Sequence, residues 1–160
     1  MLRDPAVAEI RQHLAAAPAR VFTAFAEQAL VSRWLTPSPD VVLRVIQFDF
    51  RVGGAYRFAY DVPGGSTMCV NGVYRRIDPP STLVFTWNIE PPDEHAGVHS
   101  EVVVTLTPQG AGTDLLIRHA QLTRPGAGER HEGGWRGALA HLAVLLADTR
   151  ERTSTTGEGP

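Results

Sequence analysis

Two histidines are the residues of this sequence best suited to acid–base chemistry or to anchoring a polar ligand group. His119 shares strand parity with Leu115 and Ile117, so it lies on the same side of a strand as those apolar residues. His131 precedes Trp135 by four residues in a helical pattern, which places the two on one helix face. A satisfied core position for His119 and a solvated position for His131 are the simpler interpretations. A polar anchor or a general base on a pocket wall is the alternative for both.

Aromatic side chains could supply the apolar wall of such a pocket. Trp34 lies between a short helical stretch and a proline-rich segment, so we expect it either at a pocket mouth or in the core. Trp87 is expected in the core. Trp135 begins a helical stripe and either packs on a sheet or covers the pocket. The candidate ligand-binding residues are Trp34, Tyr56, Phe58, Tyr74, Phe85, His119, His131, Trp135 and Leu139.

The sequence lacks the residue patterns of several common kinds of site. His95 and His99 are four residues apart, but neighbouring prolines and a glycine place them in a loop, where that spacing does not ensure metal geometry. Cys69 is the only cysteine, so neither an intramolecular disulfide nor a thiolate cluster can form. The chain has no lysine, no G-x-S-x-G motif and no glycine-rich phosphate loop. No metal and no cofactor is therefore expected.

The composition argues against several classes of partner. The chain has 160 residues, enough for one domain, with a net charge of −2 and no basic stripe. It has no apolar run near the ~20 residues of a membrane span, and its N-terminus lacks a signal-like segment. We expect no nucleic acid and no membrane as partners, and a cytoplasmic location. All 15 basic residues are arginine, which with many Ala, Gly and Pro residues indicates GC-rich coding and a bacterial source.

The elements that must position these side chains follow from the apolar periodicity. A strand is predicted over Val7–Leu14, then a short helix from Pro18 and a second over Leu30–Leu35. Short alternating segments separated by tight turns then predict an antiparallel meander with one buried face. Its six strands are predicted over Val41–Phe50, Ala55–Tyr60, Thr67–Ile77, Thr82–Asn88, Ser100–Thr107 and Thr113–Gln121.

One long amphipathic helix is predicted from Glu129 to about Asp148. Its apolar stripe, which runs from Trp135 through Leu139 to Leu146, must be buried against the sheet. Because sheets of this length twist and curl, space for a pocket is expected between sheet and helix.

A series of short motifs resembles the START-like, or SRPBCC, helix-grip superfamily, and within it the branch named after the activator of the 90-kDa heat-shock protein ATPase. The resemblance covers about residues 8 to 147 and implies an α+β fold. In that fold a curved antiparallel sheet of six or seven strands wraps around a long C-terminal helix, with two short helices after the first strand. We expect a START-like ligand-binding domain over residues 6–148 and a disordered tail over 149–160. The matching residues are Ala17-Pro18 with Val21-Phe22, Arg33-Trp34 with Pro37, Asp49 and Arg51 with Gly53-Gly54, Gly72 with Tyr74, Pro79 with Leu83-Val84-Phe85-Thr86-Trp87, Gly112-Thr113, His119, and Gly134-Trp135 with Leu139 and Leu142.

The resemblance implies three functions without choosing among them. The first is binding of a small hydrophobic molecule, lipid-, polyketide- or aromatic-like, between the sheet and the C-terminal helix. The second is a polyketide cyclase or aromatase that uses His119 or His131 with Tyr56 or Tyr74 as acid–base groups. The third is a protein-interaction module, co-chaperone-like or a homodimer. The fold by itself fixes none of them.

Overall fold

Strands and helices follow one another in the predicted order. The computed structural model describes the backbone of residues 4–158 and the side chains up to residue 147. The predicted α+β class is confirmed, with two short helices after the first strand and one long helix at the end. The elements are β1 (Ala8–Leu14), α1 (Pro18–Ala26), α2 (Gln28–Trp34), β2 (Val42–Phe48), β3 (Ala55–Asp61), β4 (Thr67–Asp78), β5 (Thr82–Ile89), β6 (His99–Gln109), β7 (Gly112–Ala120) and α3 (Ala127–Glu158).

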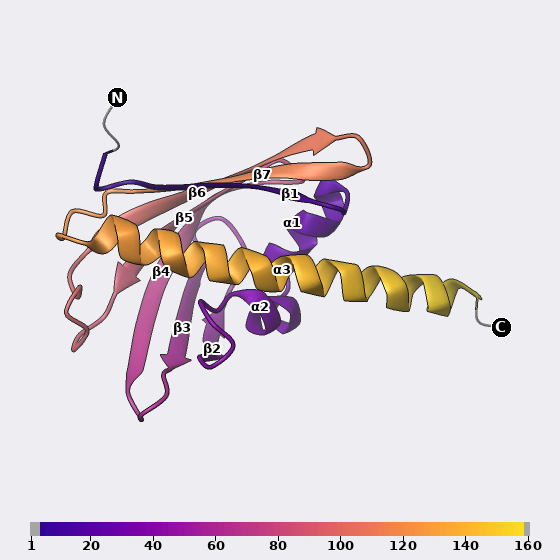
Figure 1. The fold of residues 1–160 in the computed structure, drawn as a ribbon. Coiled ribbons are helices and arrows are strands. Elements are labelled where there is room, and N and C mark those ends of the chain that lie inside the picture. The colour runs from indigo at the N-terminus through magenta and orange to yellow at the C-terminus, as the bar shows by residue number, and fades with distance from the viewer. Residues whose placement is uncertain (1–3, 159–160) are drawn as a thin grey trace.

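The strands form one antiparallel seven-stranded sheet in the order β1-β7-β6-β5-β4-β3-β2. Strands β2 to β7 are a meander, because each is joined to the next by a turn short enough to bring neighbours together. Strand β1 pairs with β7, so that Ala8 lies opposite His119 and Leu14 lies opposite Thr113. The first and the last strand of the chain are therefore neighbours in the sheet. Figure 1 shows the sheet curving around α3, which crosses its concave side, with α1 and α2 beside the middle of that helix.

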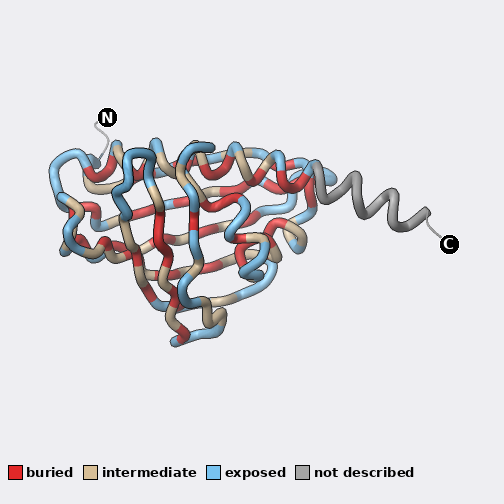
Figure 2. The backbone as a smooth tube through the Cα atoms, turned by 90° about the horizontal axis from the view of Figure 1, so that it is seen from below, coloured by how far each residue is buried: buried red, intermediate tan, exposed pale blue. Residues whose placement is uncertain are grey.

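Alternation along the strands sets which face is buried. In β5 every second side chain, from Leu83 to Ile89, is buried, while Thr82, Val84, Thr86 and Asn88 are only partly covered. The buried rows of neighbouring strands face α3, and Figure 2 shows the buried positions recurring along the strands and the helix. The period-two pattern of the sequence is therefore present in the structure, and the structure shows that the apolar row of β5 faces inward.

Gly72 permits a close approach between β4 and the side chain of a neighbouring strand. A Cβ at this position would overlap the backbone carbonyl of Thr86 and the ring of Tyr56. The Tyr56 hydroxyl donates a hydrogen bond to that same carbonyl, so the missing side chain of Gly72 makes room for the tyrosine. Glycine is the residue that allows this close approach, because it has no Cβ.

Helix α3 buries the predicted stripe and extends at both ends beyond the predicted limits. Trp135, Leu139 and Leu142 are each at most 4% exposed. The helix begins at Ala127 and continues to Glu158, so its predicted end near Asp148 is corrected. Its last turns run past the sheet (Figure 1). The predicted tail lies outside the residues whose side chains are described, and its disorder stays a prediction.

The segment between α2 and β2 is held against the middle of α3. A Cβ on Gly137 would overlap the carbonyl oxygen of Pro37, so the helix and this segment touch backbone to backbone. One turn further on, Nδ1 of His141 lies 3.1 Å from the carbonyl oxygen of Thr36. The segment therefore sits over one flank of α3, next to the space described below.

Candidate functional site

A cavity of about 590 Å³ lies between α3, the α2–β2 segment and the adjoining ends of β3, β4 and β5. Its volume is in the range of sites for small molecules, roughly 300–1,000 Å³. Apolar side chains from all these elements form most of its wall, and α3 contributes the stretch from Arg130 to Ala138. The wall is completed by Leu35, Pro37, Val41, Met68, Trp87 and Trp135, with polar groups at a few points.

His131 is one of these polar groups and is neutral at physiological pH. Its Nδ1 lies 2.8 Å from the carbonyl oxygen of Ala127, so Nδ1 carries the hydrogen and donates it. Burial, reinforced by the charge of Arg130, lowers the pKa of His131 to about 4. Nε2 is therefore an unprotonated acceptor, and it makes no hydrogen bond to another of the described residues. His131 is 8% exposed, so the solvated interpretation is wrong.

His119 lies beside His131, with ring centroids 4.8 Å apart, but both of its nitrogens are engaged. The indole N–H of Trp135 donates to Nδ1 at 3.0 Å. Nε2 therefore carries the hydrogen and donates it to Ser100 Oγ at 2.7 Å, and the Ser100 hydroxyl donates to the carbonyl of Trp87 at 2.7 Å. Burial lowers the pKa of His119 well below its usual value, and the neighbouring His131 adds to this. His119 is a satisfied core residue, the simpler of its two interpretations.

Trp87 and Trp135 form an aromatic wall of the cavity. Their ring centroids are 5.8 Å apart, and Trp87 also meets the edge of His131 at 6.4 Å. Trp87 is 7% exposed, and its Nε1–H is buried without a hydrogen-bond partner among the described residues. The sequence places Trp87 in the core by parity, which is correct. Its contact with the cavity depends on its position along β5, which parity does not report.

An ion pair at the rim joins α3 to the loop between β5 and β6. The guanidinium of Arg130 donates to both carboxylate oxygens of Asp93, each at 2.8 Å. The hydrogen bonds from Arg130 lower the pKa of Asp93, so the carboxylate stays ionised. Both residues line the cavity, and neither was singled out from the sequence. Arg130 adjoins His131 in the chain, but nothing in the sequence reveals its distant acidic partner.

The structure separates the predicted site residues into two groups. His131 and Trp135 line the cavity. The remaining candidates lie in the packed interior, at most 4% exposed, and do not reach its wall. These are Trp34, Tyr56, Phe58, Tyr74, Phe85, His119 and Leu139.

Trp34 shows why the expectation of a pocket mouth does not hold for this residue. Its indole N–H donates to the carbonyl oxygen of Ala24 at 2.8 Å, and its ring meets the face of Phe25 edge-on at 4.8 Å. The side chain thus fixes α2 against α1. The cavity is instead bordered by the residues that directly follow Trp34, beginning with Leu35.

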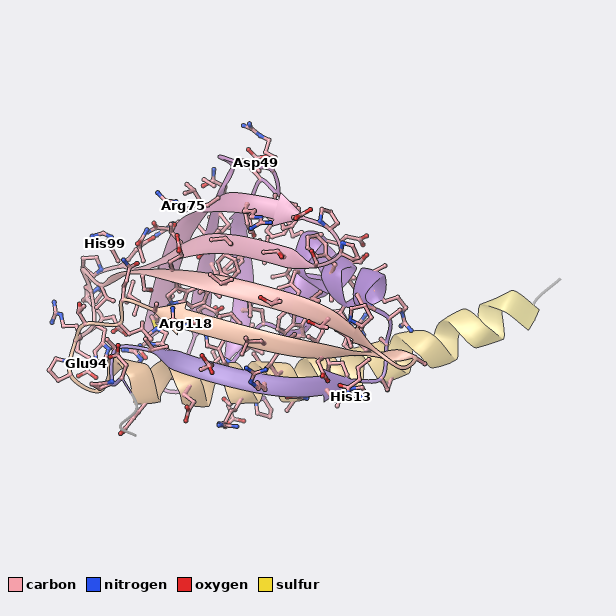
Figure 3. The ribbon with its side chains drawn as sticks, turned by 90° about the horizontal axis from the view of Figure 1, so that it is seen from above. His13, Asp49, Arg75, Glu94, His99 and Arg118 are labelled. Atoms are coloured by element: carbon pink, nitrogen blue, oxygen red, sulfur yellow. The ribbon has the colours of Figure 1, made fainter. Side chains whose placement is uncertain are left out.

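Several strand arginines lie on the opposite face of the sheet, where they pair with acids. Arg44 pairs with Asp61 at 2.6 Å, and Arg57 donates to both oxygens of Glu90 at 2.9 Å. Figure 3 looks onto this outer face, where the labelled Arg75 and Arg118 lie, with α3 behind the strands. None of these arginines lines the cavity.

Among the side chains that the structure describes, up to residue 147, His, Cys, Asp and Glu nowhere gather in threes as a metal ion would require. No helix in the described part of the chain has the length and apolar character needed to cross a membrane.

Comparison with known proteins gives a family and a set of structural relatives. Residues 15–147 match the family described as Activator of Hsp90 ATPase homolog 1-like protein. A crystal structure from Chromobacterium violaceum is similar at 28% identity, covers 89% of this chain and 97% of its own, and has a TM-score of 0.79. A Rhizobium loti structure is similar at 31% identity over 86% and 94%, with a TM-score of 0.69. The AHSA1 protein from Silicibacter pomeroyi is similar at 25% identity over 89% and 98%, with a TM-score of 0.77. Among curated proteins there was no match.

Proposed function

This chain belongs to the activator of Hsp90 ATPase homolog 1-like family, and we propose that it binds a small, mainly apolar molecule in the cavity beneath α3. The observation that carries the proposal is the cavity itself: about 590 Å³, walled by apolar and aromatic side chains, with a few polar groups. Binding in such a cavity is favoured by the burial of apolar ligand surface, by roughly 25 cal/mol per Å² of apolar surface removed from water. The polar groups fix the orientation of the ligand.

The cyclase or aromatase alternative loses one of its acid–base candidates. His119 cannot act as a base without breaking its hydrogen bond to Trp135 or Ser100, because both ring nitrogens are engaged. His131, with a pKa of about 4, is a weak base near neutral pH. Binding therefore explains the polar groups of the cavity better than catalysis does.

The protein-interaction alternative, including a homodimer, rests on exposed apolar side chains. Large apolar residues that are exposed include Val42 and Ile46 on the edge strand β2, Val73 on β4 and Val144 on α3. They are spread over several elements, whereas an interface uses a contiguous patch. We therefore rank binding within the cavity above binding on the surface.

The proposal is tested by filling the cavity from α3. Ala138 lines the cavity and is 3% exposed, so Ala138→Phe places a ring in the space a ligand would use. Ala140→Phe is the matched control, because Ala140 lies on the same helix and is exposed. The measurement is native mass spectrometry and thermal shift against a panel of fatty acids, sterols and aromatic polyketides.

We expect at least one class of the panel to raise the Tm of the wild type and to appear as a bound adduct. Ala138→Phe should weaken that binding by tenfold or more, about 1.4 kcal/mol, and Ala140→Phe should leave it unchanged. Binding that survives Ala138→Phe in a folded variant, or no binding by any class, contradicts the proposal.

A further inference from the structure

The cavity wall holds a hydrogen-bond donor and a hydrogen-bond acceptor that the protein itself does not use. The donor is Nε1–H of Trp87, which is buried without a partner among the described residues. The acceptor is Nε2 of His131, left free because Nδ1 is the nitrogen that donates to Ala127. Buried polar groups are almost always paired, so the unpaired N–H of Trp87 indicates a partner from outside the chain, and the free Nε2 of His131 is a second group that such a partner can use.

The rings that carry the two groups are neighbours on the cavity wall. The rings of Trp87 and His131 have centroids 6.4 Å apart and meet edge to face. A hydroxyl oxygen placed on the order of 2.8 Å from each nitrogen bridges two nitrogens roughly 4–5.5 Å apart, a span compatible with that spacing. A hydroxyl group is the simplest ligand group that accepts one hydrogen bond and donates another.

The charges around the cavity argue against an ionised ligand. Both terminal nitrogens of Arg130 donate to the Asp93 carboxylate, which neutralises the charge of the guanidinium and weakens its attraction for an anion. His131 presents a lone pair, which repels a carboxylate oxygen and accepts from a hydroxyl. The Asp93 carboxylate is in turn neutralised by Arg130, so it does not favour a cation.

We propose that the ligand is an uncharged apolar molecule with a hydroxyl group, which donates to Nε2 of His131 and accepts from the indole N–H of Trp87. This inference rests on the proposed function and names the class of molecule that the cavity takes. The aromatic wall of Trp87 and Trp135 holds the apolar part of the molecule. A phenol or another alcohol on a flat apolar body fits this description.

The test uses four probes that share one body and differ in one substituent. These are naphthalene, 2-methoxynaphthalene, 2-naphthol and 2-naphthoate, with binding to the full chain followed by tryptophan fluorescence and calorimetry. Naphthol can donate and accept, the methoxy compound can only accept, and naphthoate is an anion. We expect naphthol to bind about tenfold more tightly than naphthalene, with the methoxy compound between them and naphthoate the weakest.

Variants assign that advantage to the two nitrogens. Trp87→Phe removes the donor and His131→Leu removes the acceptor, and each should reduce the naphthol advantage to threefold or less. Tyr74→Phe is the matched control, since Tyr74 is a buried aromatic that does not line the cavity. Tyr60→Phe tests the competing assignment, in which the hydroxyl of Tyr60 binds the naphthol, because Tyr60 also lines the cavity. Loss of the advantage in Tyr60→Phe, with Trp87→Phe and His131→Leu unaffected, overturns the proposal.

A measurement on the wild type keeps the proposal testable if a variant does not fold. The ¹⁵N resonance of the unprotonated nitrogen of His131 should shift when naphthol is added and stay in place with naphthalene. Equal binding of naphthol and naphthalene overturns this inference and leaves the proposed function intact. Absence of binding by all four probes counts against both.

Discussion

Two histidines with ring centroids 4.8 Å apart have opposite roles in this molecule. Both ring nitrogens of His119 are hydrogen-bonded, one to Trp135 and the other to Ser100. The Ser100 hydroxyl in turn donates to the backbone carbonyl of Trp87. In His131 only Nδ1 is hydrogen-bonded, to the carbonyl of Ala127, and Nε2 has no hydrogen bond to a described residue. Both are buried and both have a lowered pKa.

Burial and a shifted pKa therefore do not distinguish a structural histidine from a binding one. The distinction lies in whether the hydrogen-bonding capacity of the ring is used up within the protein. The satisfied chain through His119 joins β5, β6, β7 and α3, so it fixes the helix on the sheet. The unsatisfied nitrogen of His131 lies on a residue of the cavity wall, where a ligand can complete it.

The largest effect should come from removing His119. His119→Leu leaves the buried indole N–H of Trp135 without an acceptor, so we expect the free energy of unfolding to fall by about 3 kcal/mol. His131→Leu is the matched variant and should cost about 1 kcal/mol or less, since only the bond to Ala127 is lost. Urea denaturation measures both. Equal losses would show that the two histidines do not differ as the structure indicates.

The pH dependence of stability should be the next largest effect. The pKa of His131 is lowered from 6.5 to about 4 in the folded state, so between those values the unfolded chain binds more protons. The contribution of His131 to the free energy of unfolding is therefore fully present above about pH 6.5 and is lost as the pH falls towards 4. The lowered pKa of His119 acts in the same direction.

From the shift of His131 alone, the loss between pH 7 and about pH 4.5 should be on the order of 2 kcal/mol. Asp93, Arg130 and His95 are the other charged or titratable groups that act on His131. The measurement is urea unfolding at a series of pH values, with His131→Leu as the control. That variant should show a shallower slope, and an unchanged slope would exclude His131 as the source.

The smallest effect separates the cavity rim from the outer face of the sheet. Arg130 and Asp93 are 33% and 16% exposed in their side chains, while Arg44 and Asp61 are 57% and 37% exposed. Arg130→Met should lower the free energy of unfolding by about 1 kcal/mol, since it leaves a partly buried carboxylate unpaired. Arg44→Met should cost less than about 0.5 kcal/mol. Thermal unfolding of the two variants at low and moderate salt checks the difference, and a larger loss for Arg44→Met would reverse it.

Much of the architecture could be predicted because it depends on local patterns. Alternation along β5 separates the buried row of Leu83, Phe85 and Trp87 from the outer row, since successive side chains point to opposite faces. The helical stripe through Trp135 and Leu139 requires a large apolar partner, and the sheet is the only one of sufficient size. These features need no knowledge of distant contacts, and the structure confirms them.

The position of the cavity could not be predicted in the same way. Phe85 and Trp87 share a strand and a face, but only Trp87 reaches the cavity, because the twist of the sheet and the path of α3 decide where a gap remains. The pairing of Arg130 with Asp93 joins residues 37 positions apart, and no periodicity encodes it.

The sequence by itself determined the fold class, the family and the alternation along each strand, because all of these depend on the order and spacing of side-chain types. Only the tertiary structure decided that His119 would be satisfied and His131 left with a free nitrogen. That outcome depends on Ser100 and Trp135 reaching His119 from β6 and α3, while the neighbouring ring borders the cavity. Hydrogen-bond capacity is a property of the assembled neighbours, so it exists only once the chain has folded.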